Sequence, residues 1–221
     1  PSHADYTAFA KYHGFEDFRG GGHFSGRITA GIVAAGAIAI SALKNKGIYI
    51  GTHISRCAGI DDVGFGDYEK DIKSLSDMQF AVLDSSKAEQ MQAEILKAKA
   101  DGDSVGGVLE TAVIGMPEGV GEPWFDTVEG VLSHALFSIP AVKGIEFGKG
   151  FELAKMRGSQ SNDPFEYKDG KVVTTTNNCG GILGGITNGM PILFTAAVKP
   201  TPSIAHKQKT VDLQTKENTT L

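Results

Sequence analysis

The sequence predicts a mixed α+β fold in a single domain of 221 residues. Segments with the alternating apolar pattern of strands and segments with helical patterns both occur along its whole length. The strands are predicted at 47–55, 104–117, 141–148 and 191–200, and the helices at 25–44, 86–101 and 126–139. Hydrophobic residues make up 41% of the chain, and no linker or low-complexity stretch divides it. One core domain spanning 1–221 is therefore the simplest organisation.

The first long helix is unusual because it has no polar face. Ser25 is a suitable N-cap, and the helix is predicted to run to about Lys44. Its central stretch, ITAGIVAAGAIAISAL (28–43), is uncharged on all sides, so we expect it to lie between two layers of structure. These 16 residues fall short of the roughly 20 that span a membrane, so a membrane helix is rejected.

The following segments predict a strand, a loop and a helix in that order. GIYIGTHIS (47–55) alternates in the manner of a strand, whereas 59–83 is loop-rich and acidic around Asp61, Asp62, Asp67 and Asp71. Ser86 and Glu89 form a capping box that predicts the start of the next helix. Gly102 is expected to end that helix.

The second half alternates strands with one helix. Asp126 and Glu129 are expected to cap the helix between the strands at 104–117 and 141–148. Residues 157–179 are predicted to be loop, and the last 18 residues are polar. At the other end, 1–22 is expected to form a short helix or loop with aromatic residues about three apart: Tyr6, Phe9, Tyr12, Phe15 and Phe18.

Composition excludes several classes of function. A formal net charge of −5 argues against a nucleic-acid-binding protein. Cys57 and Cys179 lie far apart, which indicates free thiols in a reducing compartment rather than a zinc site or a disulfide framework. The six histidines show no metal-ligand spacing and no Ser-His-Asp arrangement, so a satisfied structural role is favoured for a lone histidine.

RGGGHFSGRITAG (19–31) places three consecutive glycines before the first long helix. It is neither a P-loop nor a dinucleotide fingerprint, because the required lysine pattern and the preceding strand are both missing. Free N–H groups at a helix N-terminus favour an anion, so Gly20–Ser25 could bind a phosphate. Glycines that only let a helix and a sheet approach each other remain an equally good interpretation.

Two later segments offer similar materials. KPTPS (199–203) follows a strand and combines a lysine with two hydroxyls, which suits a phosphate but also suits a simple turn. Gly184 and Gly185 could let a planar ring lie on the backbone, or could form a bulge.

Taken together and in order, these blocks resemble the chorismate synthase family. The resemblance rests on PSHADYT, FRGGGHFSGRITAGIVAAGAI, GDSVGGVLETAVIGMPEGVGEPWFD, SIPAVKGIEFGKGF, TNNCGGILGGITNGMPI and AAVKPTPSI. It implies a fold that layers helices between two antiparallel sheets, a β-α-β sandwich. It also implies a homotetrameric, cytoplasmic flavoprotein of aromatic amino acid biosynthesis, with no nucleic acid or membrane partner.

The implied activity is a phosphate-lyase reaction. Enzymes of this family convert 5-enolpyruvylshikimate 3-phosphate to chorismate by 1,4-anti elimination and require reduced FMN. The resemblance implies His3 as a catalytic histidine beside the flavin and Arg27 in the anionic substrate site. The residues implied to contact the flavin are His23, Phe24, Ser25, Pro140, Ala141, Gly184, Lys199, Pro200, Thr201, Pro202 and Ser203. We expect these segments to surround one cavity, with no metal site.

The sequence also departs from the family pattern. His23-Phe24 stands where Arg-Ser is usual, Ile28 where Glu is common, and Pro140 where Asn is common. The family's N-terminal Ser-His-Gly motif, its early arginines and its late Arg-[His/Ser]-Asp-Pro-Cys motif are absent, so the chain is expected to be a core truncated at both ends and impaired alone. Two alternatives stay open: a non-catalytic, self-associating structural core, and an unrelated phosphate-binding domain.

Overall fold

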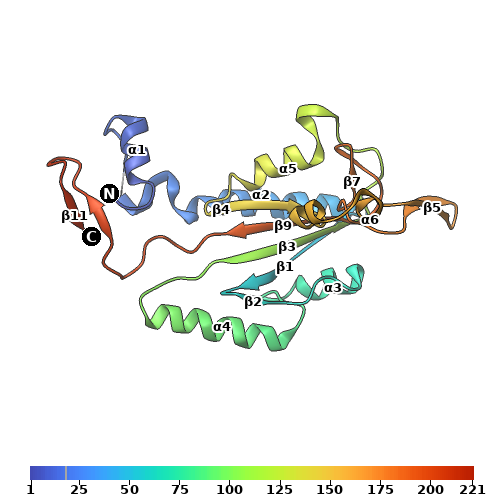
Figure 1. Cartoon of the computed structure of the whole chain (residues 1–221), viewed down its shortest axis with the longest axis horizontal. Helices are drawn as coiled ribbons and strands as arrows, with labels where there is room; N and C mark the ends of the chain where they lie inside the picture. Colours follow the sequence, from blue (N-terminus) through green and yellow to red (C-terminus); the bar gives the residue numbers. More distant parts are fainter. Residues whose placement is uncertain (18) are drawn as a thin grey trace.

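The computed structural model describes residues 1–17 and 19–221 and is built on one antiparallel sheet (Figure 1). The five strands lie in the order β2-β1-β3-β9-β4. Their bounds are β1 Tyr49–Cys57, β2 Ile60–Asp61, β3 Gly107–Ile114, β4 Val142–Phe147 and β9 Ile192–Val198. The four predicted strands are confirmed, and the α+β class with them.

The register of the sheet decides which side chains share a face. Thr52 is opposite Thr111, and His53 is opposite Glu110, which in turn is opposite Thr195. A bulge after Ile54 shifts the pairing by one residue at the end of β1. Because side chains alternate between faces, His53, Glu110 and Thr195 emerge on the same side of the sheet.

One hydrophobic cluster lies beneath the β1–β2 edge, where α4 (Ser85–Ala100) packs. Met91 has no exposed surface and contacts the buried Cys57 and Val82. The predicted helix is confirmed, but the predicted capping box is wrong. Asp84 is the N-cap, because its carboxylate accepts a hydrogen bond from the backbone N–H of Ser86 at 2.9 Å.

A second cluster lies near the start of β9, on the face of the sheet that carries Phe194. Helix α5 (Val128–Leu136) covers Ile192 and Phe194 together with the short hairpin β7 (Ile182–Leu183) and β8 (Ile186–Thr187). The N-cap of α5 is Thr127 rather than Asp126, and the Thr127 hydroxyl accepts from the N–H of Gly130 at 2.9 Å.

Helix α2 (Ala30–Lys44) confirms the predicted apolar helix but has little cover within this chain. Ser25 caps the preceding 3₁₀ turn η2 (Gly26–Thr29), and none of the α2 residues is buried. Ile38 is 75% exposed. The continuous helical stretch Gly26–Lys44 is long and apolar enough to cross a membrane by composition alone. The second layer expected over this helix is not formed by the described part of the chain.

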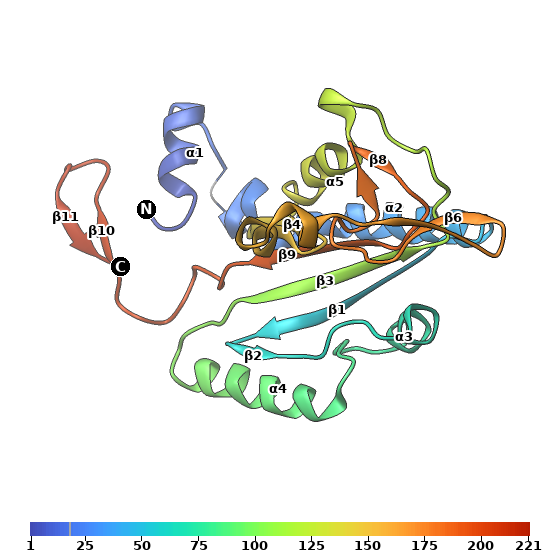
Figure 2. The ribbon, with the colours of Figure 1, turned by 45° about the vertical axis from the view of Figure 1, so that its right-hand side comes forward.

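The two ends of the chain lie together, away from the sheet. Helix α1 (Asp5–Tyr12) and the hairpin β10 (Lys209–Val211) with β11 (Asn218–Thr220) occupy one end of the molecule in both views (Figures 1 and 2). The Thr210 hydroxyl donates to the Pro1 carbonyl. Phe18, one of the spaced aromatics, lies outside the described residues.

Two regions predicted as loop contain regular structure. Helix α3 (Tyr68–Leu75) occurs within 59–83, capped by Asp67, and contributes Ile72 and Leu75 to the interior. The hairpin β5 (Phe165–Lys168) and β6 (Lys171–Thr174) occurs within 157–179, after the single turn α6 (Gly158–Ser161). Only two to four apolar residues mark each element, which is too few for a clear periodic signal.

Candidate functional site

The polar face of the sheet carries a cavity of about 540 Å³. Strands β1, β3, β9 and β4 form its floor, and the segment after β2 forms one wall. Its lining includes Ser55, Asp62, Glu110, Glu146, Phe151 and Thr195. A second hollow, of about 920 Å³, lies between the end of α2, α3 and the ends of β1 and β3. None of the residues that the family resemblance implies for the flavin or substrate lines either cavity.

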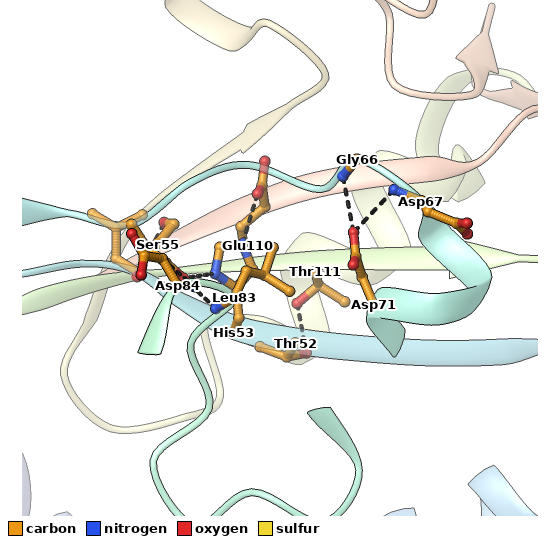
Figure 3. A network of polar contacts seen from close by, with 12 residues as sticks. Thr52, His53, Ser55, Gly66, Asp67, Asp71, Leu83, Asp84, Glu110 and Thr111 are labelled. Atoms are coloured by element: carbon orange, nitrogen blue, oxygen red, sulfur yellow. Dashed lines mark hydrogen bonds and ion pairs between the residues drawn. The ribbon is translucent and has the colours of Figure 1, made fainter. Parts of the chain in front are cut away.

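His53 is fully buried beneath the first cavity and bound on both sides by carboxylates (Figure 3). Its Nδ1 lies 2.9 Å from Asp62 Oδ2, and its Nε2 lies 2.8 Å from Glu110 Oε2. The ring edge also meets Phe65, with the ring centroids 5.0 Å apart. Burial tends to lower the pKa of His53, but the hydrogen bonds and charges of Glu110 and Asp62 outweigh burial and raise it.

Asp62 binds two backbone amides in addition to His53. Its carboxylate also accepts from the backbone N–H groups of Leu83, at 2.7 Å, and Asp84, at 3.0 Å. One buried side chain therefore ties β1 to the segment that leads into α4. The structural role that the sequence favoured for a lone histidine is confirmed at His53.

The other acidic residues of this region also have local roles. Asp61 pairs with Arg56 at the surface. Asp67 caps α3, and Asp71 accepts from the N–H groups of Gly66 and Asp67. Among the residues described, no group of three or more His, Cys, Asp or Glu side chains could hold a metal ion.

Several residues implied to contact the flavin lie at one end of the sheet. The N–H of Lys199 donates to the Ala141 carbonyl at 2.9 Å, which joins the end of β9 to the start of β4. The Ser104 hydroxyl donates to the Thr201 carbonyl at 2.7 Å. The start of α2 lies at this same end in both views (Figures 1 and 2). The structure thus brings 140–141 and 199–203 together, with the helix that follows Ser25 nearby.

Gly184 lies at the opposite end of β9. Its hairpin packs through Ile182 against Ile192, the first residue of β9, whereas Lys199 follows the last. A Cβ added at Gly184 would meet nothing, but one at Gly185 would collide with Thr127. Gly185 therefore serves close packing onto α5, and Gly184 faces open space. Ser25, Gly184 and Lys199 line neither of the two cavities described above, and Gly184 and Lys199 lie at opposite ends of β9.

The glycine loop before α2 is held by its own arginine. Gly20, Gly21 and Gly22 all have positive φ, which suits glycine, and the Arg27 guanidinium donates to the Gly20 carbonyl at 2.7 Å. His23 and Phe24 are exposed. The hydrogen bond from Arg27 to the Gly20 carbonyl therefore closes the loop.

His3 is exposed in the turn before α1. The neighbouring Asp5 carboxylate accepts from the backbone N–H of Ser2 at 2.8 Å and makes no hydrogen bond with the His3 ring in the described structure. The side chain that the resemblance implies as catalytic therefore stands free at the end that carries both termini.

Sequence reasoning missed the His53 network because its partners are distant in the sequence. Asp62 is nine residues away and Glu110 is 57 residues away. The available signal was the alternation of GIYIGTHIS, which places His53 on one face, and a strand pairing that puts Glu110 opposite it.

Comparison with known proteins gives one consistent answer. The chorismate synthase family matches residues 1–221. A chorismate synthase from Dehalococcoides mccartyi strain 195 is 50% identical over all of this chain and 60% of its own length. One from Thermococcus kodakarensis is 49% identical over all of this chain and 61% of its own. A crystal structure of chorismate synthase matches with a TM-score of 0.80 and 33% identity, over 89% of this chain and 63% of that one. The chain spans about 60% of the length of these relatives.

Proposed function

Because the chain belongs to the chorismate synthase family, we propose that it forms the core of an enzyme that converts 5-enolpyruvylshikimate 3-phosphate to chorismate and phosphate. In this elimination the C–O bond to phosphate breaks, the phosphate leaves with the bonding electrons, and a proton leaves from the other end of the allylic system. A second ring double bond forms, so no net oxidation takes place. The match along all of residues 1–221 is the observation that carries this proposal.

Reduced FMN is the proposed cofactor, and when bound it would supply electron density as the C–O bond breaks. The residues at the Lys199 end fit its phosphate. The Lys199 ammonium and the Thr201 and Ser203 hydroxyls have no protein hydrogen-bond partner among the described residues, so they are free to bind an anion. Prolines at 200 and 202 stiffen the backbone between them. Arg27 uses one of the five N–H donors of its guanidinium on Gly20, so its other donors could bind the substrate phosphate.

The positions of the implied segments favour a site that this chain does not complete alone. Gly184 lies at the other end of β9 from Lys199, and α2 is uncovered. Either the remaining part of the protein or another copy of the chain would supply the missing cover and the missing catalytic groups. A homotetramer in the cytoplasm is the proposed assembly and location.

A second candidate function rests on the exposed α2 alone. An apolar helix without buried residues is also what a non-catalytic, self-associating core would present. That alternative requires association but no flavin binding, so the two proposals separate on cofactor affinity.

The experiment is a titration of FMN into the intact protein, followed by flavin absorbance, with Lys199→Ala and His3→Ala as variants. We expect saturable binding that Lys199→Ala weakens by about tenfold or more, because a charge-assisted contact to phosphate is lost. In a separate assay of turnover with reduced FMN, His3→Ala is expected to lower the rate by about 10²-fold or more.

Matched controls keep the result specific. Lys207→Ala and His206→Ala remove the same side chains from exposed positions a few residues beyond 199–203. Both should bind FMN as the unmodified protein does. Association without saturable flavin binding would favour the structural alternative, and equal losses in Lys207→Ala and Lys199→Ala would contradict the assigned phosphate site.

A further inference from the structure

His53 contacts two carboxylates, and none of the residues implied to bind the flavin takes part in these contacts. Asp62 and Glu110 approach different ring nitrogens, at 2.9 and 2.8 Å. A neutral imidazole has only one N–H, so it can donate to only one of two carboxylates. The other nitrogen would then direct its lone pair at a carboxylate oxygen. Only the imidazolium, with two N–H groups, satisfies both partners when both are ionised.

We propose that His53 is an imidazolium in the folded protein, and that its proton is a pH-sensitive latch that holds the Glu110 carboxylate against the floor of the cavity on the polar face of the sheet. The latch joins three elements, since His53 lies on β1, Glu110 on β3 and Asp62 in the segment after β2. The ring has no exposed surface.

The other groups around the ring support this charge state. Tyr68 from α3 faces the same site, and burial together with the negative charge of Glu110 raises the pKa of its phenol, so it stays neutral. Phe65 presents an apolar ring. Arg56 is paired with Asp61 at the surface and is not among the hydrogen-bond partners of Asp62 or Glu110. No second cation replaces His53 among the described contacts.

Loss of the proton should release Glu110 rather than Asp62. The Asp62 side chain has no exposed surface and keeps two backbone N–H donors, from Leu83 and Asp84, whatever the state of His53. The Glu110 side chain is 24% exposed, and Glu110 already lines the cavity of about 540 Å³. Water can solvate the freed Glu110, which makes this bond the cheaper one to break. The cavity would then gain a mobile carboxylate near Glu146.

The direction of the pH dependence follows from the raised pKa of His53. The folded state binds the proton more tightly than the unfolded chain, whose histidine titrates near 6.5. The latch therefore contributes its full stabilisation below about pH 6.5 and loses it as the pH rises through the folded pKa.

The test measures the pKa of His53 by exchange of its imidazole Cε1 hydrogen in D₂O across a range of pH, with the folded protein then digested and the peptide that contains His53 analysed by mass spectrometry. We expect a midpoint above 6.5 in the unmodified protein. Glu110→Gln keeps an acceptor for Nε2–H but removes the charge, so it should weaken proton binding by about tenfold or more. Glu146→Gln removes a carboxylate from the same cavity without touching His53, and it should change the midpoint little.

A second variant keeps the proposal open to refutation if Glu110→Gln folds poorly. Asp62→Asn should lower the same midpoint while leaving an amide oxygen for one backbone donor. A midpoint at or below 6.5 in the unmodified protein would mean a neutral imidazole beside a protonated carboxyl, and would overturn the proposal. So would a shift in Glu110→Gln no larger than that in Glu146→Gln.

Discussion

The region around His53 and the region around α2 differ in how far this chain alone satisfies its side chains. Around His53, a buried imidazole, a buried carboxylate and two backbone amides all find partners at 2.7–3.0 Å. Helix α2 has fifteen residues and no acidic side chain, and none of its residues is buried. The first region is a completed piece of protein interior, and the second is an apolar helix that the described part of this chain leaves uncovered.

The difference indicates which parts of the molecule should tolerate change and which should not. Mutations in the buried region around His53 should change the free energy of unfolding. Mutations on the uncovered face of α2 should instead change the binding of whatever covers it.

Removing the carboxylate of Asp62 should destabilise the protein most. Asp62→Ala leaves a buried imidazolium short of one partner and two buried N–H groups without an acceptor. We expect the free energy of unfolding, measured with denaturant, to fall by about 3–5 kcal/mol. Asp61→Ala is the matched control, because the neighbouring carboxylate is exposed and pairs only with Arg56. Equal effects in the two variants would contradict the latch geometry.

Truncating Met91 should cost nearly as much through packing alone. The side chain has no exposed surface and lies at the centre of the α4 cluster, so Met91→Ala should lower the free energy of unfolding by about 2–5 kcal/mol. Leu96 on the same helix is 63% exposed. Leu96→Ala should therefore stay within about 0.5 kcal/mol of the unmodified protein. If Leu96→Ala were the more damaging, α4 would be facing the other way.

A charge placed on α2 tests whether this helix is covered in the intact protein. Ile38→Lys should cost at least about 2 kcal/mol of assembly or folding free energy if Ile38 is buried there. Sedimentation velocity and denaturant unfolding together distinguish lost assembly from lost folding. Asn45→Lys adds the same charge just beyond the helix and should be silent. An unchanged Ile38→Lys protein would show that α2 is truly a surface helix.

The smallest effect is expected beside the glycine-rich segment. Burial tends to raise the pKa of Asp163, but its hydrogen bonds from Thr176, Cys179 and Asn178 lower it. The stabilisation is therefore present at neutral pH and is lost as the pH falls through the lowered pKa. Thr176→Val removes one donor, at 2.6 Å, and should cost about 1 kcal/mol at neutral pH. Its acid-unfolding midpoint should move to higher pH, and a midpoint that moved lower would refute this cause.

The sequence predicted the regular elements better than the contacts between them. All four strands were recognisable as short apolar segments, with clear alternation at 47–55, and α2 and α4 were recognisable because each is long. The caps were misplaced by one or two positions, since Asp84 and Thr127 compete with neighbouring Ser86 and Asp126 for the same role. Helix α3 has only two buried residues, and so its period was hidden.

The site was predictable only through resemblance to a family. No local pattern reveals that Lys199 and Ala141 are hydrogen-bonded, because 58 residues separate them and only the pairing of β9 with β4 brings them together. The separation of Gly184 from Lys199 was equally hidden. The His53 network depends on strand register, which the pattern of a single strand does not specify.

Our proposal is that this chain is the core of a chorismate-forming phosphate-lyase. The most direct measurement is an anaerobic assay of the intact protein with 5-enolpyruvylshikimate 3-phosphate and chemically reduced FMN, in which chorismate and phosphate are both quantified. We expect chorismate and phosphate to form in equal amounts, and only when reduced flavin is present. The flavin should still be reduced at the end of the reaction. Phosphate release without chorismate, or an undiminished rate without flavin, would contradict it.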